Sequence, residues 1–138
     1  MDAREFFSAV AAWNYRVFRH GSNSMANLWN AVVALNSVPE WIALARLNYA
    51  DVPRSELDRM ANDIRSKHSE LSDLLLCANT LKHVRSHKKE TRITSSTGWE
   101  PDDSTSWTIC DTPSGRTLDV VTVCERAHST LSSYPELK

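Results

Sequence analysis

Residues 74–92, which read LLLCANTLKHVRSHKKETR, decide the fold, and they change from apolar to basic along their length. At the roughly 100° per residue of an α-helix, the apolar positions share one broad side: Leu71, Leu74, Cys77, Ala78, Leu81 and Val84. The polar positions share the other: Ser72, Asn79, His83, Ser86 and His87. The spacing therefore predicts a buried helix from Ser69 to about Ser86 that runs out into positive charge.

Amphipathic helices are predicted before this stretch. Residues 2–19 have apolar side chains at helical spacing, which we expect to face inward: Phe6, Phe7, Val10, Trp13, Val17 and Phe18. Gly21 should end this helix, and Asn23 or Ser24 should cap the next. The inward stripe of that second helix is predicted as Met25, Leu28, Trp29, Val32, Val33 and Leu35. We expect Trp13, Trp29 and Trp41 to meet in one core.

Pro39 either kinks the second helix or occupies the first turn of a short successor. Residues 48–53 read as a connection, after which Ser55 is the expected N-cap of another helix. The inward residues of that helix are predicted as Leu57, Met60, Ala61 and Ile64. Asp63 and Lys67 form an i,i+4 pair that is typical of a solvated surface.

The character of the chain changes after Lys89. The segments TRITSST (91–97) and SWTICDT (106–112) alternate and are rich in β-branched residues, PSG (113–115) is a tight turn, and RTLD (116–119) leads out. These patterns predict an antiparallel meander of two or three strands over about 91–118. Asp119 should cap a last helix that Pro135 stops, with these residues inward: Val120, Val123, Cys124, Ala127 and Leu131.

The chain of 138 residues is therefore predicted to be a single, mainly α domain over 1–138. It is a bundle of four to five helices with a small antiparallel β-hairpin or meander inserted before the last helix. Asp2 and Glu5 stand where a signal peptide has positive charge, and no apolar run is long enough to span a membrane. Three widely spaced cysteines without a CxxC pair fit a reducing compartment. We expect a cytoplasmic protein with no membrane contact.

Three residues late in the 69–86 helix form the candidate catalytic set: Asn79, Lys82 and His83. Asn79 and His83 are i,i+4 neighbours and Lys82 flanks them, so His83 could transfer a proton near neutral pH while Lys82 holds a phosphate. The alternative interpretation is structural. In it, Asn79 bonds the backbone of a neighbouring helix or loop, and His83 is a half-buried residue at a helix end.

The same region holds the basic cluster of the chain: Lys82, His83, Arg85, His87, Lys88, Lys89 and Arg92. Some cations are expected at a helix C-terminus because of the helix dipole, but this cluster exceeds that need. The net charge of −1 offers no global attraction to nucleic acid, so the cluster predicts a local phosphate-binding edge. His83 and His87 form HxxxH without the glutamate of HExxH or an obvious third ligand. We therefore expect neither a metal nor another cofactor.

Leu75 and Leu76 intrude on the polar side of the 69–86 helix. A polar strip that contains leucines is seldom simply exposed to solvent, so we expect it to lie against another helix or a second copy of the protein. The second possibility predicts a homodimer through helix 69–86.

The segment ANTLKH (78–83) resembles the second signature helix of HEPN-like domains, and it is similar to a helix signature, ANxxKH, of small bacterial proteins. The similarity of layout covers most of the chain. HEPN ribonucleases cleave RNA without a metal, using the ribose 2′-hydroxyl as nucleophile, at sites where two such helices pair. Asn79 and His83 match the family's polar residue and histidine. Ala78 stands at the arginine position, and Lys82 lacks the bidentate fork of arginine.

The resemblance, with that departure, implies a non-catalytic or weakly catalytic module that binds RNA or protein. It also implies a setting in defence, toxin–antitoxin or mobile-element biology. One alternative is a metal-independent endoribonuclease in which His83 is the general base and Lys82 or Arg85 stabilises the pentavalent phosphate.

The other alternative is a protein-interaction inhibitor encoded by a mobile element. Its contact surface would include these residues of the β insertion: Trp99, Glu100, Asp102, Asp103 and Trp107. Against it stands an interpretation of the insertion as a solvated hairpin with one core tryptophan.

Overall fold

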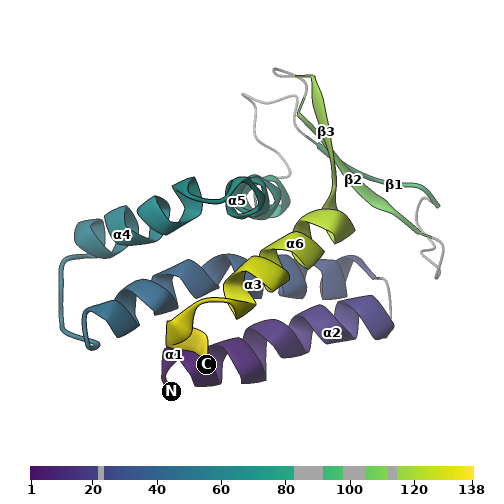
Figure 1. The fold of residues 1–138 in the computed structure, drawn as a ribbon. Helices are drawn as coiled ribbons and strands as arrows, with labels where there is room; N and C mark the ends of the chain where they lie inside the picture. The colour runs from purple at the N-terminus through teal and green to yellow at the C-terminus, as the bar shows by residue number, and fades with distance from the viewer. Residues whose placement is uncertain (22–23, 83–91, 98–104, 112–114) are drawn as a thin grey trace.

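A computed structural model of the chain describes residues 1–21, 24–82, 92–97, 105–111 and 115–138. The predicted fold class is confirmed: the protein is mainly helical, with a small antiparallel sheet before its last long helix (Figure 1). The first elements are α1 (Ala3–Phe6), the π-helical η1 (Phe7–Ala11), α2 (Ala12–His20), α3 (Met25–Arg46), α4 (Arg54–Ser66) and α5 (Ser69–Lys82). Then come β1 (Arg92–Ser95), β2 (Trp107–Asp111), β3 (Arg116–Asp119), α6 (Val120–Ser132) and the 3₁₀ turn η2 (Pro135–Leu137).

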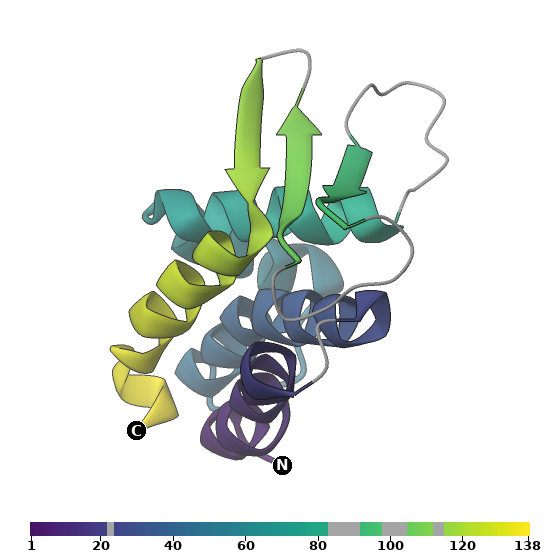
Figure 2. The ribbon, with the colours of Figure 1, turned by 90° about the vertical axis from the view of Figure 1, so that its right-hand side faces the viewer.

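Helix α3 lies at the centre of the bundle. It contacts α2, α4, α5 and α6 and carries a stripe of fully buried side chains, including Leu28, Val32, Leu35, Val38 and Ile42. Helix α5 crosses over α3, as its end-on view in Figure 1 and its side view in Figure 2 both show. No helix among the described residues is long and apolar enough to cross a membrane.

The strands form the predicted meander in the order β1-β2-β3. Ile93 pairs with Ile109, and Ile109 pairs with Leu118, so one apolar row crosses all three strands. This row packs on the helical core, where Ile109 is fully buried. Trp107 is only 4% exposed, which confirms one core tryptophan in the insertion and removes this residue from any partner surface.

The π-helical segment explains a wrong prediction about Trp13. A π turn takes up one residue more than an α turn, so the helix after Ala11 is rotated by roughly a quarter turn against the regular pattern. The rotation turns Trp13 outward and leaves it 56% exposed, while Phe18 stays buried. The side-chain amide of Asn14 donates to the backbone carbonyl of Val10, in the π-helical segment, at 2.8 Å.

The expected cluster of three tryptophans is therefore wrong. Trp13 is exposed, whereas Trp29 and Trp41 are partly buried against the core. Trp41 stacks on Phe6, with ring centroids 4.9 Å apart.

Helix α3 settles one open alternative and corrects two expectations. Pro39 is buried inside one continuous helix, so no short successor exists. Met25 and Val33 are 42% and 37% exposed, because Met25 is the first residue of the helix and Val33 lies beside the buried stripe. The N-cap of α3 is Ser24, which is one of the two predicted residues. Its hydroxyl accepts a hydrogen bond from the backbone N–H of Asn27 at 3.1 Å.

The start of α4 also differs from expectation, whereas its inward face agrees. Pro53, not Ser55, is the N-cap, and its carbonyl accepts the amide of Glu56. Proline fixes the backbone just before Arg54, so the helix begins one residue ahead of Ser55. Leu57, Ala61 and Ile64 are buried and Met60 is partly so.

The last helix and the surface pair agree with expectation. Asp119 caps α6 by accepting the amide of Val121 at 3.1 Å. The predicted inward residues of α6 are all buried, and Lys67 pairs with Asp63 at 3.2 Å.

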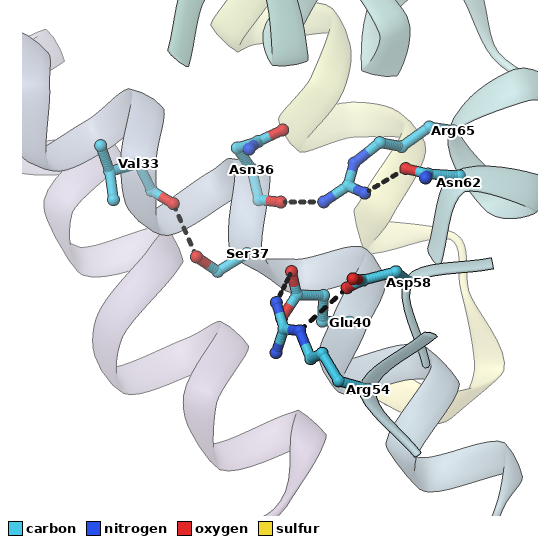
Figure 3. A network of polar contacts seen from close by, with 8 residues as sticks. All are labelled: Val33, Asn36, Ser37, Glu40, Arg54, Asp58, Asn62 and Arg65. Atoms are coloured by element: carbon cyan, nitrogen blue, oxygen red, sulfur yellow. Dashed lines mark hydrogen bonds and ion pairs between the residues drawn. The ribbon is translucent and has the colours of Figure 1, made fainter. Parts of the chain in front are cut away.

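A polar network ties α4 to α3 (Figure 3), and one further hydrogen bond ties α4 to the start of α5. The guanidinium of Arg65 is buried and donates to the carbonyl of Asn36 and to Oδ1 of Asn62, both at 2.9 Å. The carbonyl of Arg65 accepts the hydroxyl of Ser72 at 3.1 Å. Burial lowers the pKa of Arg65, and this effect is opposed by nearby Glu40.

The neighbouring carboxylates in Figure 3 belong to a different arginine. Arg54 contacts Glu40 at 3.1 Å and Asp58 at 3.0 Å, whereas no carboxylate of the described residues lies within ion-pair distance of Arg65. Removing Arg65 would therefore leave no buried anion behind.

We predict that Arg65→Met changes the free energy of unfolding by less than about 1 kcal/mol, because methionine fills the same space and strands no charge. Arg65→Ala should cost about 2–3 kcal/mol through the cavity it leaves. Urea titration of both variants checks this, with Arg54→Met as an exposed control. An equal loss in the methionine and alanine variants would contradict it.

Candidate functional site

Helix α5 presents the predicted apolar side to the core. Leu71, Leu74, Cys77, Ala78 and Leu81 are all buried, against α3 and α6. Val84, the last member of the predicted set, lies outside the described residues. The helix is held at its start by the bond between Ser72 and the carbonyl of Arg65.

The opposite side of α5 forms an outer strip, which we define as Ser72, Leu75, Leu76 and Asn79. Ser72 and Asn79 are exposed, and the two leucines are only partly buried. The side chain of Asn79 makes no hydrogen bond to another described residue, so the expected bond to a neighbouring backbone is not found in that part of the chain.

Most of the predicted site residues cannot be placed. Lys82 is the last residue of α5 and Arg92 the first of β1, and the side chains of both lie outside the described part, as do residues His83, Arg85, His87, Lys88 and Lys89. Of the candidate catalytic set, Asn79 alone has a described side chain. The basic segment 82–92 runs from the last residue of α5 to the first residue of β1. Because β1 contacts α5, the two elements that hold the ends of the segment are neighbours.

Charge is strongly segregated along the chain. The basic segment 82–92 carries five of the sixteen lysines and arginines and one of the seventeen acidic residues. Its net charge is therefore +4, while the rest of the chain has −5. A nearly neutral protein thus has one locally cationic segment, continuous with the end of α5.

Ala78 faces the core and not the outer strip. It is 8% exposed and belongs to the core cluster, whereas its neighbour Asn79 points to solvent. An arginine at position 78 would start from a core position and not from the exposed side of α5. The exposed side of α5 has a polar amide and no described cation.

Polar residues gather around His68, at the turn between α4 and α5. Their types are ones that enzymes use in catalysis, and the sequence did not predict this group. His68 Nε2 lies 3.0 Å from the hydroxyl of Tyr134, and its Nδ1 lies 3.8 Å from a carboxylate oxygen of Glu70. Glu70 accepts the hydroxyl of Thr130, and this bond is the main reason why its pKa lies below the usual range. His68 comes four residues after Ile64, so helical periodicity could have placed it on the inner side.

The order carboxylate, imidazole, hydroxyl is that of a nucleophile and its base, but the chemistry does not fit. Burial raises the pKa of Tyr134, although Arg46 partly opposes this, so its hydroxyl stays protonated. The 3.8 Å between His68 and Glu70 is too long for a hydrogen bond. The group joins the α4–α5 turn to the C-terminus, where Arg46 pairs with Glu136 at 2.6 Å.

A hollow of about 200 Å³ lies between the starts of α5 and α6 and the strand β3. Its carboxylates are already engaged in the protein. Asp73 pairs with Arg116 at 3.1 Å, Asp119 caps α6, and Glu70 bonds Thr130. The hollow therefore offers no unpaired acid for a ligand.

The described thiols are not reactive groups. Cys77 and Cys124 are buried, and burial raises the pKa of Cys77 to about 12 and that of Cys124 as well. A thiol with such a pKa is protonated at neutral pH and is a poor nucleophile. Within the described ranges no group of three histidine, cysteine or acidic side chains could hold a metal ion; the HxxxH pair lies outside them.

Comparison with protein families, curated proteins and solved structures finds no match to this chain.

Proposed function

We propose that this protein is a self-associating, HEPN-like helical domain that binds RNA on the basic segment 82–92 and has little or no catalytic activity. One observation carries the proposal. The outer strip of α5, with two partly buried leucines and an exposed asparagine, leads directly into a segment of net charge +4 in a chain that is otherwise acidic.

Self-association through α5 is supported by the leucines of the outer strip. Pairing two copies about Leu75 and Leu76 would remove apolar surface from water. An antiparallel arrangement centred there brings Lys82 of one copy to the level of Ser69 and Glu70 of the other, next to an acidic helix start. A parallel arrangement would bring two basic segments together, so electrostatics favour the antiparallel dimer.

Binding is favoured over cleavage by the chemistry of α5. The resembling nucleases use an arginine at the position of Ala78, which here faces the core. A lysine at position 82 would bring charge without the bidentate geometry that stabilises a pentavalent phosphate. The ribonuclease alternative assigns the general base to His83 and the stabilisation of the pentavalent phosphate to Lys82 or Arg85. It predicts that RNA is cleaved in the presence of EDTA and that the products have cyclic-phosphate ends.

The inhibitor alternative retains less support. Trp107, one of its proposed contact residues, is buried, while Trp99, Glu100, Asp102 and Asp103 lie outside the described residues. A protein partner that copurifies without RNA would favour it.

We predict a dimer that depends on the outer strip. Light scattering after gel filtration should give twice the monomer mass of 15.6 kDa for the wild-type protein and the monomer mass for Leu75→Glu. Val33→Glu, a matched change at a partly exposed apolar residue of α3, should remain dimeric. A monomeric wild-type protein, or a dimeric Leu75→Glu variant, would show that α5 is not the interface.

We also predict salt-dependent RNA binding. Contacts from all five cations of the segment 82–92 would give a slope of log affinity against log salt of up to about −3.5. The variant Arg85→Gln/Lys88→Gln/Lys89→Gln should lose about 2 units of that slope. Arg59→Gln/Lys67→Gln, which changes exposed cations of the α4 region, is the control and should behave as wild type.

The same RNA should remain intact during incubation with the wild-type protein in EDTA. Cleavage that His83→Ala abolishes would replace the proposal by the ribonuclease alternative. Absence of any salt-dependent retention of RNA would overturn it.

A further inference from the structure

We propose that Trp13 and Arg16 form a second binding site, for single-stranded RNA, in which a base stacks on the indole ring and the guanidinium contacts the adjacent phosphate. The inference rests on the proposed RNA-binding function and adds to it a contact on α2, in a different element from the basic segment 82–92.

The exposure of Trp13 is produced by the helix geometry. In a regular α-helix, Trp13 would follow Phe6 and Val10 on the inner side. The π-helical turn Phe7–Ala11 rotates Trp13 outward, so that this residue is 56% exposed. Tryptophan has the largest side chain of any residue type. Such turns are rare and often occur at functional sites, where they redirect a side chain.

The surroundings of Trp13 suit a flat ligand. Arg16, one turn later, lies over the indole with its guanidinium carbon 5.8 Å from the ring centroid. Ala9, one turn earlier, is exposed and has no side-chain atom beyond Cβ to cover the ring. A π-face with an adjacent guanidinium is the combination that holds the bases and phosphates of single strands, largely without sequence preference.

The helix that carries this site is positively charged. No aspartate or glutamate occurs from Phe6 to Pro39, whereas Arg16 and Arg19 both lie in α2. Across the interface with α6, Glu125 is paired with Arg19 at 2.6 Å. Arg16 has no ion pair with any described residue, and its charge helps burial to lower the pKa of His128.

The site is also rigidly supported. The ring of His128 on α6 stacks on Tyr15 at 4.6 Å and on Phe7 at 5.6 Å, which fixes α2 against α6 beneath the exposed side. A fixed backbone under Trp13 reduces the entropy that is lost when a base stacks on its ring. A membrane surface would need a broad apolar face instead of one ring and one unpaired cation, so RNA is the ligand that the observations favour.

The test measures binding of short oligouridylate and oligoadenylate, and of an RNA duplex of equal length, to the full-length protein. Trp13→Ala should weaken binding of both single strands by about 5- to 100-fold and leave duplex binding unchanged. Trp13→Phe should keep most of the affinity, and Met25→Ala, which removes an exposed side chain without a π-face, should keep all of it. Because Trp13 is exposed, circular dichroism should show all variants folded.

An NMR readout locates the contact. The five tryptophans should give separate indole N–H signals, and Trp13→Phe would identify the one from Trp13. That signal should shift when oligouridylate is added to the wild-type protein. It should also shift in the variant Arg85→Gln/Lys88→Gln/Lys89→Gln, at a higher concentration of oligouridylate.

The outcomes separate the two proposals. If the triple variant loses binding while Trp13→Ala binds single strands as wild type does, the Trp13 site is overturned and the basic segment stands. If Trp13→Ala alone loses binding, the site stands and the basic segment falls. A wild-type protein that binds no RNA, or that uses Trp13 to bind anionic vesicles or a protein instead, overturns the site.

Discussion

The packing of the other helices on α3 is the interaction on which the rest of the structure depends. This helix has buried side chains over most of its length and touches α2, α4, α5 and α6, so each of those helices needs only one apolar side. That division explains why α5 can keep a polar outer strip while its inner side completes the core. It also explains why a long helix with apolar residues on nearly all sides is stable here.

Two exposed features of this bundle have different origins. The outer strip of α5 is the ordinary solvent side of an amphipathic helix, made unusual by two leucines. The exposed Trp13 arises from a local change of helix type that overrides the amphipathic pattern. Both lie on helices whose opposite sides are buried, so any ligand bound there would meet a supported surface.

The sequence predicted the fold where the pattern was regular. The three-stranded meander, the Asp119 cap and the inward side of α6 all follow from alternation, turn residues and helical spacing. Trp13 was misplaced because helical spacing assumes 3.6 residues per turn, and no residue in Phe7–Ala11 signals a π turn. Arg65 and His68 were missed because their roles depend on partners such as Asn36 and Tyr134, distant in sequence. The basic segment 82–92 remains a prediction from composition, since residues 83–91 lie outside the described residues.

The π-helical turn gives the N-terminal helix an uneven tolerance to change. Replacing an alanine between Phe7 and Ala11 alters one contact, but deleting one residue would restore the regular α-helical register and rotate everything after it. Tyr15 would leave His128, and Trp13 would turn inward. Related sequences that keep this arrangement should therefore vary in residue type across the turn while its length stays constant.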